Sequence, residues 1–121
     1  MNLDIITQEP NEGHFILAMK GKLDTETYTK LEQTLDLLFL KPVNSITMDL
    51  AQLTYISSMG LRVIISTTKK LSRLRAQLII ANASPSITSV LEIAKTLPSM
   101  AIFSSTAEAD AYLTNIQNSQ K

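Results

Sequence analysis

Apolar residues alternate with polar ones along several short segments of the chain, a pattern that predicts β-strands. Residues 14–20 predict a strand with Phe15, Leu17 and Met19 on one face and the smaller set Ile16 and Ala18 on the other, and residues 3–8 alternate more loosely. Turn-forming residues at 9–13 separate these two runs, which therefore predict a hairpin. Further strands are predicted at 45–50, 78–81 and 100–103. The run at 78–81 is apolar throughout, which is typical of a strand buried on both faces.

Four other segments repeat apolar residues every three or four positions, as amphipathic helices do. They cover residues 24–40, 58–73, 85–97 and 105–116. Asp24 or Thr25 is predicted to cap the first helix, and Ser84 before Pro85 the third. Ser105 and Glu108 form a capping box for the last helix, and Glu108 and Asp110 complement the positive end of that helix. The polar residues 114–121 are expected to fray.

The predicted order of elements is β-β-α-β-α-β-α-β-α. Strands that alternate with helices indicate an α/β fold with right-handed crossovers. We therefore expect one domain over residues 1–121, with a mixed, mostly parallel sheet of about five strands and about four helices. The chain shows no internal repeat or low-complexity linker.

Two adjacent serines lie between the strand at 45–50 and the helix that follows it. A helix start exposes unpaired N–H groups and a partial positive charge, which suit a capping hydroxyl and a nearby phosphate. Capping is the simpler interpretation of the pair, with Ser57 as the cap. We expect both Ser57 and Ser58 to face solvent, and a structure with both hydroxyls buried in the core would overturn the phosphorylation switch. Gly60 is expected to allow close backbone packing at this helix start.

The apolar residues around the two serines leave an alternative open. Ile56, Met59 and Leu61 all lie at this helix start, where each has a simple interpretation as a core residue. One of them left outside the core would instead form part of a docking surface for another protein. The sequence does not decide which of the three is exposed.

Composition and charge exclude several classes of function. The 11 basic and 11 acidic residues cancel, so no basic surface for nucleic acid is predicted. Cysteine is absent, which excludes disulfides and thiol chemistry. The N-terminus resembles no signal peptide and no apolar run is long enough to span a bilayer, so we expect a cytoplasmic protein without membrane contact.

The chain also offers little for catalysis. His14 is its only histidine, and no Gly-x-Ser-x-Gly elbow surrounds the serine pair. The carboxylates show no metal-ligand spacing, and the three glycines are too scattered to hold a nucleotide phosphate. We therefore expect a protein-binding function, no enzyme activity, no metal and no cofactor.

Four segments, in the right order, resemble one known family. They are Met48-Asp49-Leu50 followed by Tyr55-Ile56-Ser57-Ser58-Met59-Gly60-Leu61, then Gly21-Lys22-Leu23-Asp24, Ile80 to Pro85 and Ile102 to Ala109. The chain is similar along nearly its whole length to STAS domains, specifically to the bacterial anti-sigma-factor antagonists.

The resemblance implies a partner-switching mechanism. In that family the unphosphorylated antagonist binds an anti-sigma factor, a serine kinase of the GHKL type, and so frees the sigma factor. The kinase phosphorylates one serine, and a metal-dependent phosphatase reverses this. That serine corresponds to Ser58, with Ser57 as the alternative acceptor. The implied partner-binding residues are Asp24, Tyr55, Ile56, Ser57, Ser58, Met59, Gly60, Leu61 and Arg62. Alone, the protein is expected to be a monomer or weak dimer.

Two positions depart from the family motif. Ser57 stands where the motif has Asp, and Met59 where it has Ser or Thr. If the missing carboxylate orients the acceptor hydroxyl, phosphorylation is slower or lost. The alternative function is a STAS scaffold or transport-accessory subunit that binds a partner without phosphorylation.

Overall fold

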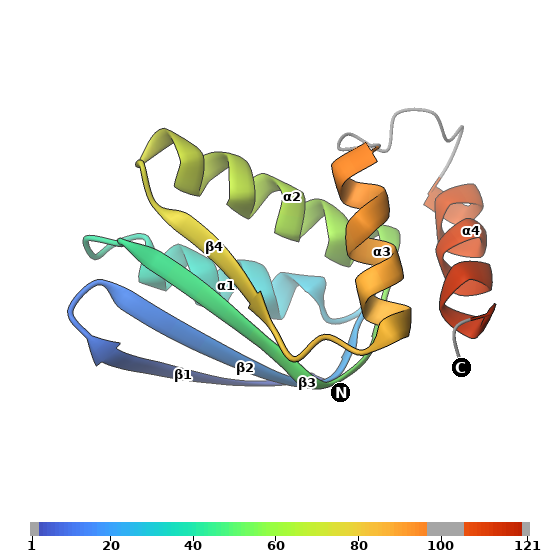
Figure 1. Ribbon diagram of the computed structural model, residues 1–121, viewed down its shortest axis with the longest axis horizontal. Helices are drawn as coiled ribbons and strands as arrows, with labels where there is room; N and C mark the ends of the chain where they lie inside the picture. Colours follow the sequence, from blue (N-terminus) through green and yellow to red (C-terminus); the bar gives the residue numbers. More distant parts are fainter. Residues whose placement is uncertain (1–2, 97–105, 120–121) are drawn as a thin grey trace.

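The computed structural model describes residues 3–96 and 106–119, which form a sheet and the helices around it (Figure 1). The elements in chain order are β1 (Leu3–Asn11), β2 (His14–Leu23), α1 (Tyr28–Leu38), β3 (Ser45–Ile56), α2 (Ser58–Arg73), β4 (Gln77–Ala81), α3 (Pro85–Thr96) and α4 (Thr106–Ser119). The α/β fold class and the predicted order of these elements are confirmed. The fifth strand, predicted at 100–103, and the cap at Ser105 lie outside the described residues.

The described strands form one sheet in the order β1-β2-β3-β4. β1 and β2 are antiparallel and joined through Gly13, whose φ of 78° suits glycine, so the predicted hairpin is confirmed. β3 pairs in parallel with both β2 and β4. β3 is longer than predicted, because its pairing with β2 continues to the partners Leu23 and Ile56. This extension brings the end of β3 beside the end of β2.

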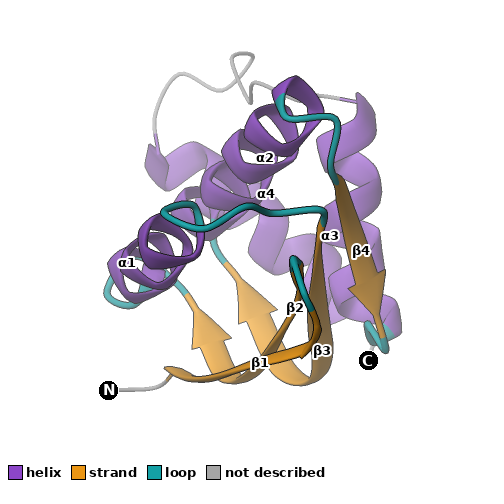
Figure 2. Cartoon of the chain, turned by 90° about the vertical axis from the view of Figure 1, so that its left-hand side faces the viewer, coloured by secondary structure: helices purple, strands orange, loops and turns teal. Residues whose placement is uncertain are grey.

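The helices α1 and α2 cover one face of the sheet (Figure 2). The alternating residues Phe15, Leu17 and Met19 of β2 point into the core on that side and are fully buried. On the opposite face, Ile6 is 63% exposed and Ile79 is 43% exposed. The period-two pattern thus places one set of side chains against the helices and leaves the other set partly open.

Three local predictions are wrong. Thr27, not Asp24 or Thr25, precedes the first residue of α1, while the Asp24 carboxylate accepts hydrogen bonds from the N–H groups of Glu26 and Thr27. β4 is not buried on both faces, because Ile79 points to the face of the sheet opposite α1 and α2 and is 43% exposed. Residues expected to fray belong to α4 as far as Ser119, because their side chains bond to other elements.

Candidate functional site

The junction between β3 and α2 has the capping geometry that the sequence predicts. Ser57 lies in extended conformation between the two elements, and its Oγ accepts a hydrogen bond of 3.2 Å from the N–H of Gly60. The Ser57 N–H donates to the Leu23 carbonyl at 2.8 Å. The junction is therefore fixed both to the first turn of α2 and to the end of β2.

The two serine hydroxyls do not face solvent. Ser57 is 2% exposed and Ser58 is 0% exposed, so the predicted exposure of both is wrong. At Ser58 this end of α2 is in contact with α4, which stands beside α3 at the end of the molecule where α2 begins (Figure 1). A switch in which an open serine waits for a kinase is contradicted by this burial.

Side chains of α4 bond to the residues on either side of Ser57. Asp110 Oδ1 accepts from the Ser58 N–H at 2.8 Å, and the Thr114 and Tyr55 hydroxyls lie 2.7 Å apart. The Gln117 side chain pairs with both backbone groups of Ile56, accepting at 2.9 Å and donating at 3.0 Å. Asp110 is predicted to complement its own helix, but its carboxylate also reaches the positive end of α2.

The Ser58 hydroxyl is buried without a hydrogen-bond partner in the part of the chain that the structure describes. An unpaired buried hydroxyl destabilises the folded state by about 1–3 kcal/mol. The hydroxyl that the resemblance identifies as the phosphate acceptor is thus buried without a hydrogen-bond partner among the described residues.

We expect Ser58→Ala to raise the free energy of unfolding by about 1 kcal/mol, because it removes this unpaired hydroxyl. Ser57→Ala, the matched change at the preceding residue, should lower it by about 1 kcal/mol through loss of the helix cap. Urea denaturation of the two variants measures both effects. A Ser58→Ala variant as unstable as Ser57→Ala would contradict the assignment of an unsatisfied hydroxyl.

Gly60 lies where the chain needs a residue without a side chain. A Cβ at this position would lie 2.6 Å from Leu23 Cγ and 2.8 Å from the Leu23 carbonyl oxygen. The predicted close packing at Gly60 is confirmed, and the contact joins the start of α2 to the end of β2.

The implied partner-binding residues divide by exposure. Ile56, Leu61 and Gly60 are buried, so they shape the junction from inside. Met59 is half-buried, which answers the question that the sequence left open, and Arg62 is exposed. Tyr55 and Asp24 are half-buried, and Asp24 follows the residue whose carbonyl holds Ser57. The surface accessible to a partner therefore consists of Arg62 and the exposed parts of Met59, Tyr55 and Asp24.

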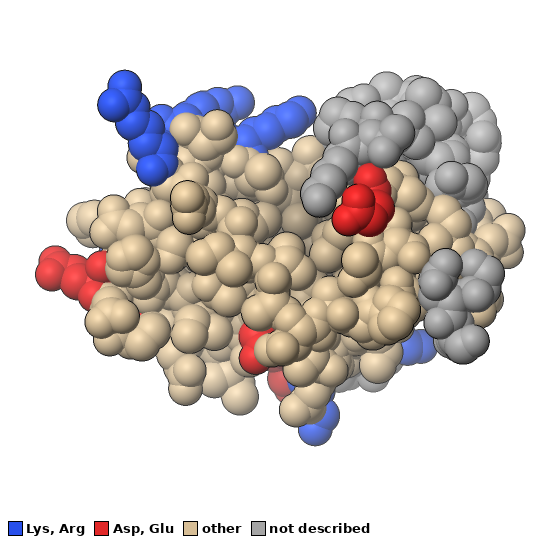
Figure 3. Space-filling view, in the orientation of Figure 1, with Lys and Arg blue, Asp and Glu red and all other residues tan. Residues whose placement is uncertain are grey.

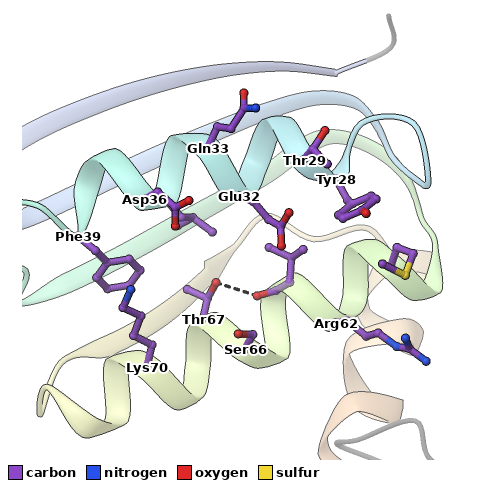
Figure 4. A pocket seen from close by; sticks show the side chains of 13 residues that line it. Tyr28, Thr29, Glu32, Gln33, Asp36, Phe39, Arg62, Ser66, Thr67 and Lys70 are labelled. Carbon is purple, nitrogen blue, oxygen red and sulfur yellow. Dashed lines mark hydrogen bonds between the residues drawn. The ribbon is translucent and has the colours of Figure 1, made fainter.

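Met59 and Arg62 also line a groove of about 500 Å³ between α1 and α2. Figure 4 shows Glu32 and Asp36 on the α1 side of this groove, and Arg62 and Lys70 on the α2 side. The Lys70 ammonium lies 4.3 Å from the centre of the Phe39 ring. The groove thus has acidic side chains on its α1 wall and basic side chains on its α2 wall.

Basic side chains gather on one edge of the molecule. Figure 3 shows Lys and Arg along the edge over α2, whose last turns contain Lys69, Lys70 and Arg73, and few charges over the rest of that face. Within residues 3–96 and 106–119, no group of His, Asp or Glu side chains is arranged to hold a metal ion. None of the helices in these ranges is long and apolar enough to cross a bilayer.

Sequence reasoning missed the contribution of α4. Asp110, Thr114 and Gln117 are spaced four and three residues apart, so they lie on one face of the helix. This polar stripe is the signal for the contact, and it is not visible in the pattern of apolar residues.

Comparison with known proteins identifies the family to which the chain belongs. A sequence model of the STAS domain matches residues 6–109. The chain belongs to the STAS domain family. Among curated proteins, this STAS domain is 30% identical over 88 residues to the putative anti-sigma factor antagonist BtrV of Bordetella bronchiseptica, covering 73% of this chain and 76% of that protein. It is 26% identical to the anti-sigma-B factor antagonist of Listeria monocytogenes, over 77% of this chain and 82% of that protein.

Solved structures share the fold of this STAS domain. The anti-sigma factor antagonist SpoIIAA in its unphosphorylated form matches with a TM-score of 0.69 at 17% identity, covering 78% of this chain and 84% of that one. The phosphorylated form of SpoIIAA, described as a Bacillus cell fate determinant, matches with a TM-score of 0.66 at 17% identity, over 78% and 86% of the two chains. At these identities the likeness establishes the fold alone.

Proposed function

We propose that this STAS domain is an anti-sigma factor antagonist whose unphosphorylated form binds an anti-sigma factor. The partner is a serine kinase of the GHKL type, and phosphorylation of Ser58 releases it. A metal-dependent serine phosphatase restores the binding form, and the exchange takes place in the cytoplasm. The observation that supports this most directly is the position of Ser58, the first residue of α2, in a chain 30% identical to a putative anti-sigma factor antagonist.

The start of α2 suits a phosphate chemically. The first N–H groups of a helix are unpaired within it and have a partial positive charge, so a phosphate there is favoured. Ser57 already uses its hydroxyl to cap the helix, which makes the Ser58 hydroxyl the free acceptor. The fold around α2 is therefore expected to tolerate a phosphoserine at position 58.

The partner surface that we propose continues from the junction into the α1–α2 groove. Met59 is polarizable and flexible, and such residues suit adaptable protein interfaces. Arg62 next to it is exposed and able to pair with an acidic side chain. A kinase that docks over Met59 and Arg62 lies within reach of the residue that it modifies.

We expect the kinase to place its phosphate on Ser58 rather than on Ser57, because the capping bond to Gly60 occupies the Ser57 hydroxyl. The test combines the protein with ATP and the kinase encoded near its gene, and then locates the modified residue by fragmentation mass spectrometry. Ser58→Ala should remove the phosphate, whereas Ser57→Ala should keep it. Phosphate found on Ser57 would overturn the assignment.

A second function has a specific observation in its favour. Ser58 is fully buried and the motif carboxylate is replaced by Ser57, both of which suit a STAS scaffold or transport-accessory subunit that is never phosphorylated. In that case the complex with the partner stays intact after ATP is added. Size-exclusion chromatography of the complex before and after ATP separates the two functions.

A further inference from the structure

α4 bonds to the β3–α2 junction directly at the proposed acceptor, whose side chain is fully buried. Asp110, Thr114 and Gln117 bond to Ser58, Tyr55 and Ile56, and the Ser58 hydroxyl is left without access to solvent. No kinase can transfer a phosphate to a hydroxyl in this state, because the transfer needs the oxygen in line with ATP. The acceptor becomes usable only if α4 moves.

The bonds that hold α4 over the junction are polar and exchangeable with water. The N–H and carbonyl of Ile56 pair with Gln117, and the Ser58 N–H pairs with Asp110. When α4 lifts, water satisfies the same groups, so each broken bond is largely replaced. Leu113 of α4 is fully buried, and its contacts with the core oppose opening.

The closed state, in which α4 is docked on the junction, leaves one buried polar group without a hydrogen-bond partner, and opening gives that group access to water. The Ser58 hydroxyl has no hydrogen-bond partner in the described part of the chain, and water can supply one only when the junction is uncovered. This unsatisfied group raises the free energy of the closed state. The difference between the closed and open states is correspondingly smaller.

The negative charge of a phosphate on Ser58 would favour the open state over the closed state. The Asp110 carboxylate lies at hydrogen-bond distance from the Ser58 N–H, at the place where the helix would hold a phosphate. A phosphoserine adds about −1.5 to −2 charges, which Asp110 repels. A phosphate on Ser58 and a docked α4 therefore exclude each other.

We propose that α4 is a displaceable cap, whose opening exposes Ser58 and the surrounding junction to the kinase partner. This inference rests on the proposed function, since it takes Ser58 to be the acceptor. In the closed form the protein neither accepts phosphate nor presents the junction. The phosphorylated form stays open because Asp110 cannot return to the Ser58 N–H.

The test uses a thiol reporter, because the chain contains no cysteine. In a Ser58→Cys variant of the full chain, the rate of reaction with 5,5′-dithiobis(2-nitrobenzoate) measures how often the cap opens. Ser66→Cys, at an exposed position of the same helix, gives the rate for an open thiol. We expect the thiol at position 58 to react about 100-fold more slowly than the one at position 66, because it must wait for opening.

Adding Gln117→Ala to Ser58→Cys should raise the reaction rate roughly tenfold, since it removes both bonds to Ile56. The matched control is Asn118→Ala, which truncates an exposed amide one residue further along α4 and should leave the rate within about twofold. A Thr67→Cys reporter, buried elsewhere in α2, should keep its slow rate when Gln117→Ala is added, because only the junction opens.

Three results would overturn the proposal that α4 opens to expose Ser58. They are equal rates at positions 58 and 66 in the unchanged background, no effect of Gln117→Ala, and an equal rise at positions 58 and 67, which would mean global unfolding. None of these measurements involves a kinase. A failure of the proposed phosphorylation, seen as absent phosphate in mass spectrometry, is therefore distinct from a failure of the cap.

Discussion

Gly60→Val will lower the free energy of unfolding by about 3 kcal/mol or more, the upper range for an overpacked core. The reason is that a Cβ at position 60 already comes within 2.8 Å of the Leu23 carbonyl oxygen, which is backbone and cannot rotate away. The two further methyl groups of valine add to the clash. Thermal and urea denaturation of the purified variant measure the loss.

Two controls separate this clash from helix propensity. Ser57→Ala, three residues earlier, removes a cap without adding bulk and should cost about 1 kcal/mol. Gly60→Ala would stabilise an open helical position by about 0.5–1 kcal/mol, but we expect it to destabilise here because of Leu23. Equal midpoints for Gly60→Val and Ser57→Ala would contradict the role assigned to Gly60.

Phosphorylation of Ser58 is expected to weaken binding to the kinase partner by about 100-fold or more. A partner docked over the junction must bury the phosphate charge, and an unpaired buried charge costs several kcal/mol. Each 1.4 kcal/mol corresponds to about a tenfold change in affinity, so a micromolar complex is lost. Isothermal titration calorimetry with the phosphorylated and unmodified forms gives the ratio of the two affinities.

Substitutions at the same residue test whether charge is the cause. Ser58→Ala should bind as the unmodified protein does, and Ser58→Glu should bind more weakly, with a smaller effect because one carboxylate has less charge than a phosphate. Ser72→Glu adds the same carboxylate at an exposed position of α2 that does not line the α1–α2 groove, and it serves as the matched control. A Ser58→Glu variant that binds as tightly as the unmodified protein would contradict the electrostatic block.

The periodic patterns of the sequence were sufficient to predict most of the fold. The strand at 14–20 and the helix at 58–73 appear nearly as predicted, because the buried apolar residues of each recur with the period of that element and face one core. The partial exposure of Leu78 to Ala81 could not be predicted in the same way, because an apolar run looks the same in a strand covered on both faces and in one covered on a single face. Which neighbours a strand receives depends on the whole topology.

The site was predictable only in its local part. The cap at Ser57 and the close approach at Gly60 depend on residues within a few positions or on the adjacent strand end, so turn and capping rules find them. The contacts at Ser58 and Ile56 come from Asp110 and Gln117, which are far away in sequence and polar. No hydrophobic pattern reports such a contact, which explains why the expected exposure was wrong.

The order of the elements along the chain determines when the β3–α2 junction is covered during synthesis. α4 follows every other described element, so the ribosome completes β3 and α2 before it has made Asp110 or Gln117. At roughly 5–20 residues per second, the delay lasts a few seconds. During that interval the nascent chain contains Ser58 and the backbone of Ile56 without the side chains that later bond to them. A newly made molecule therefore passes through an uncovered form before it reaches the covered one.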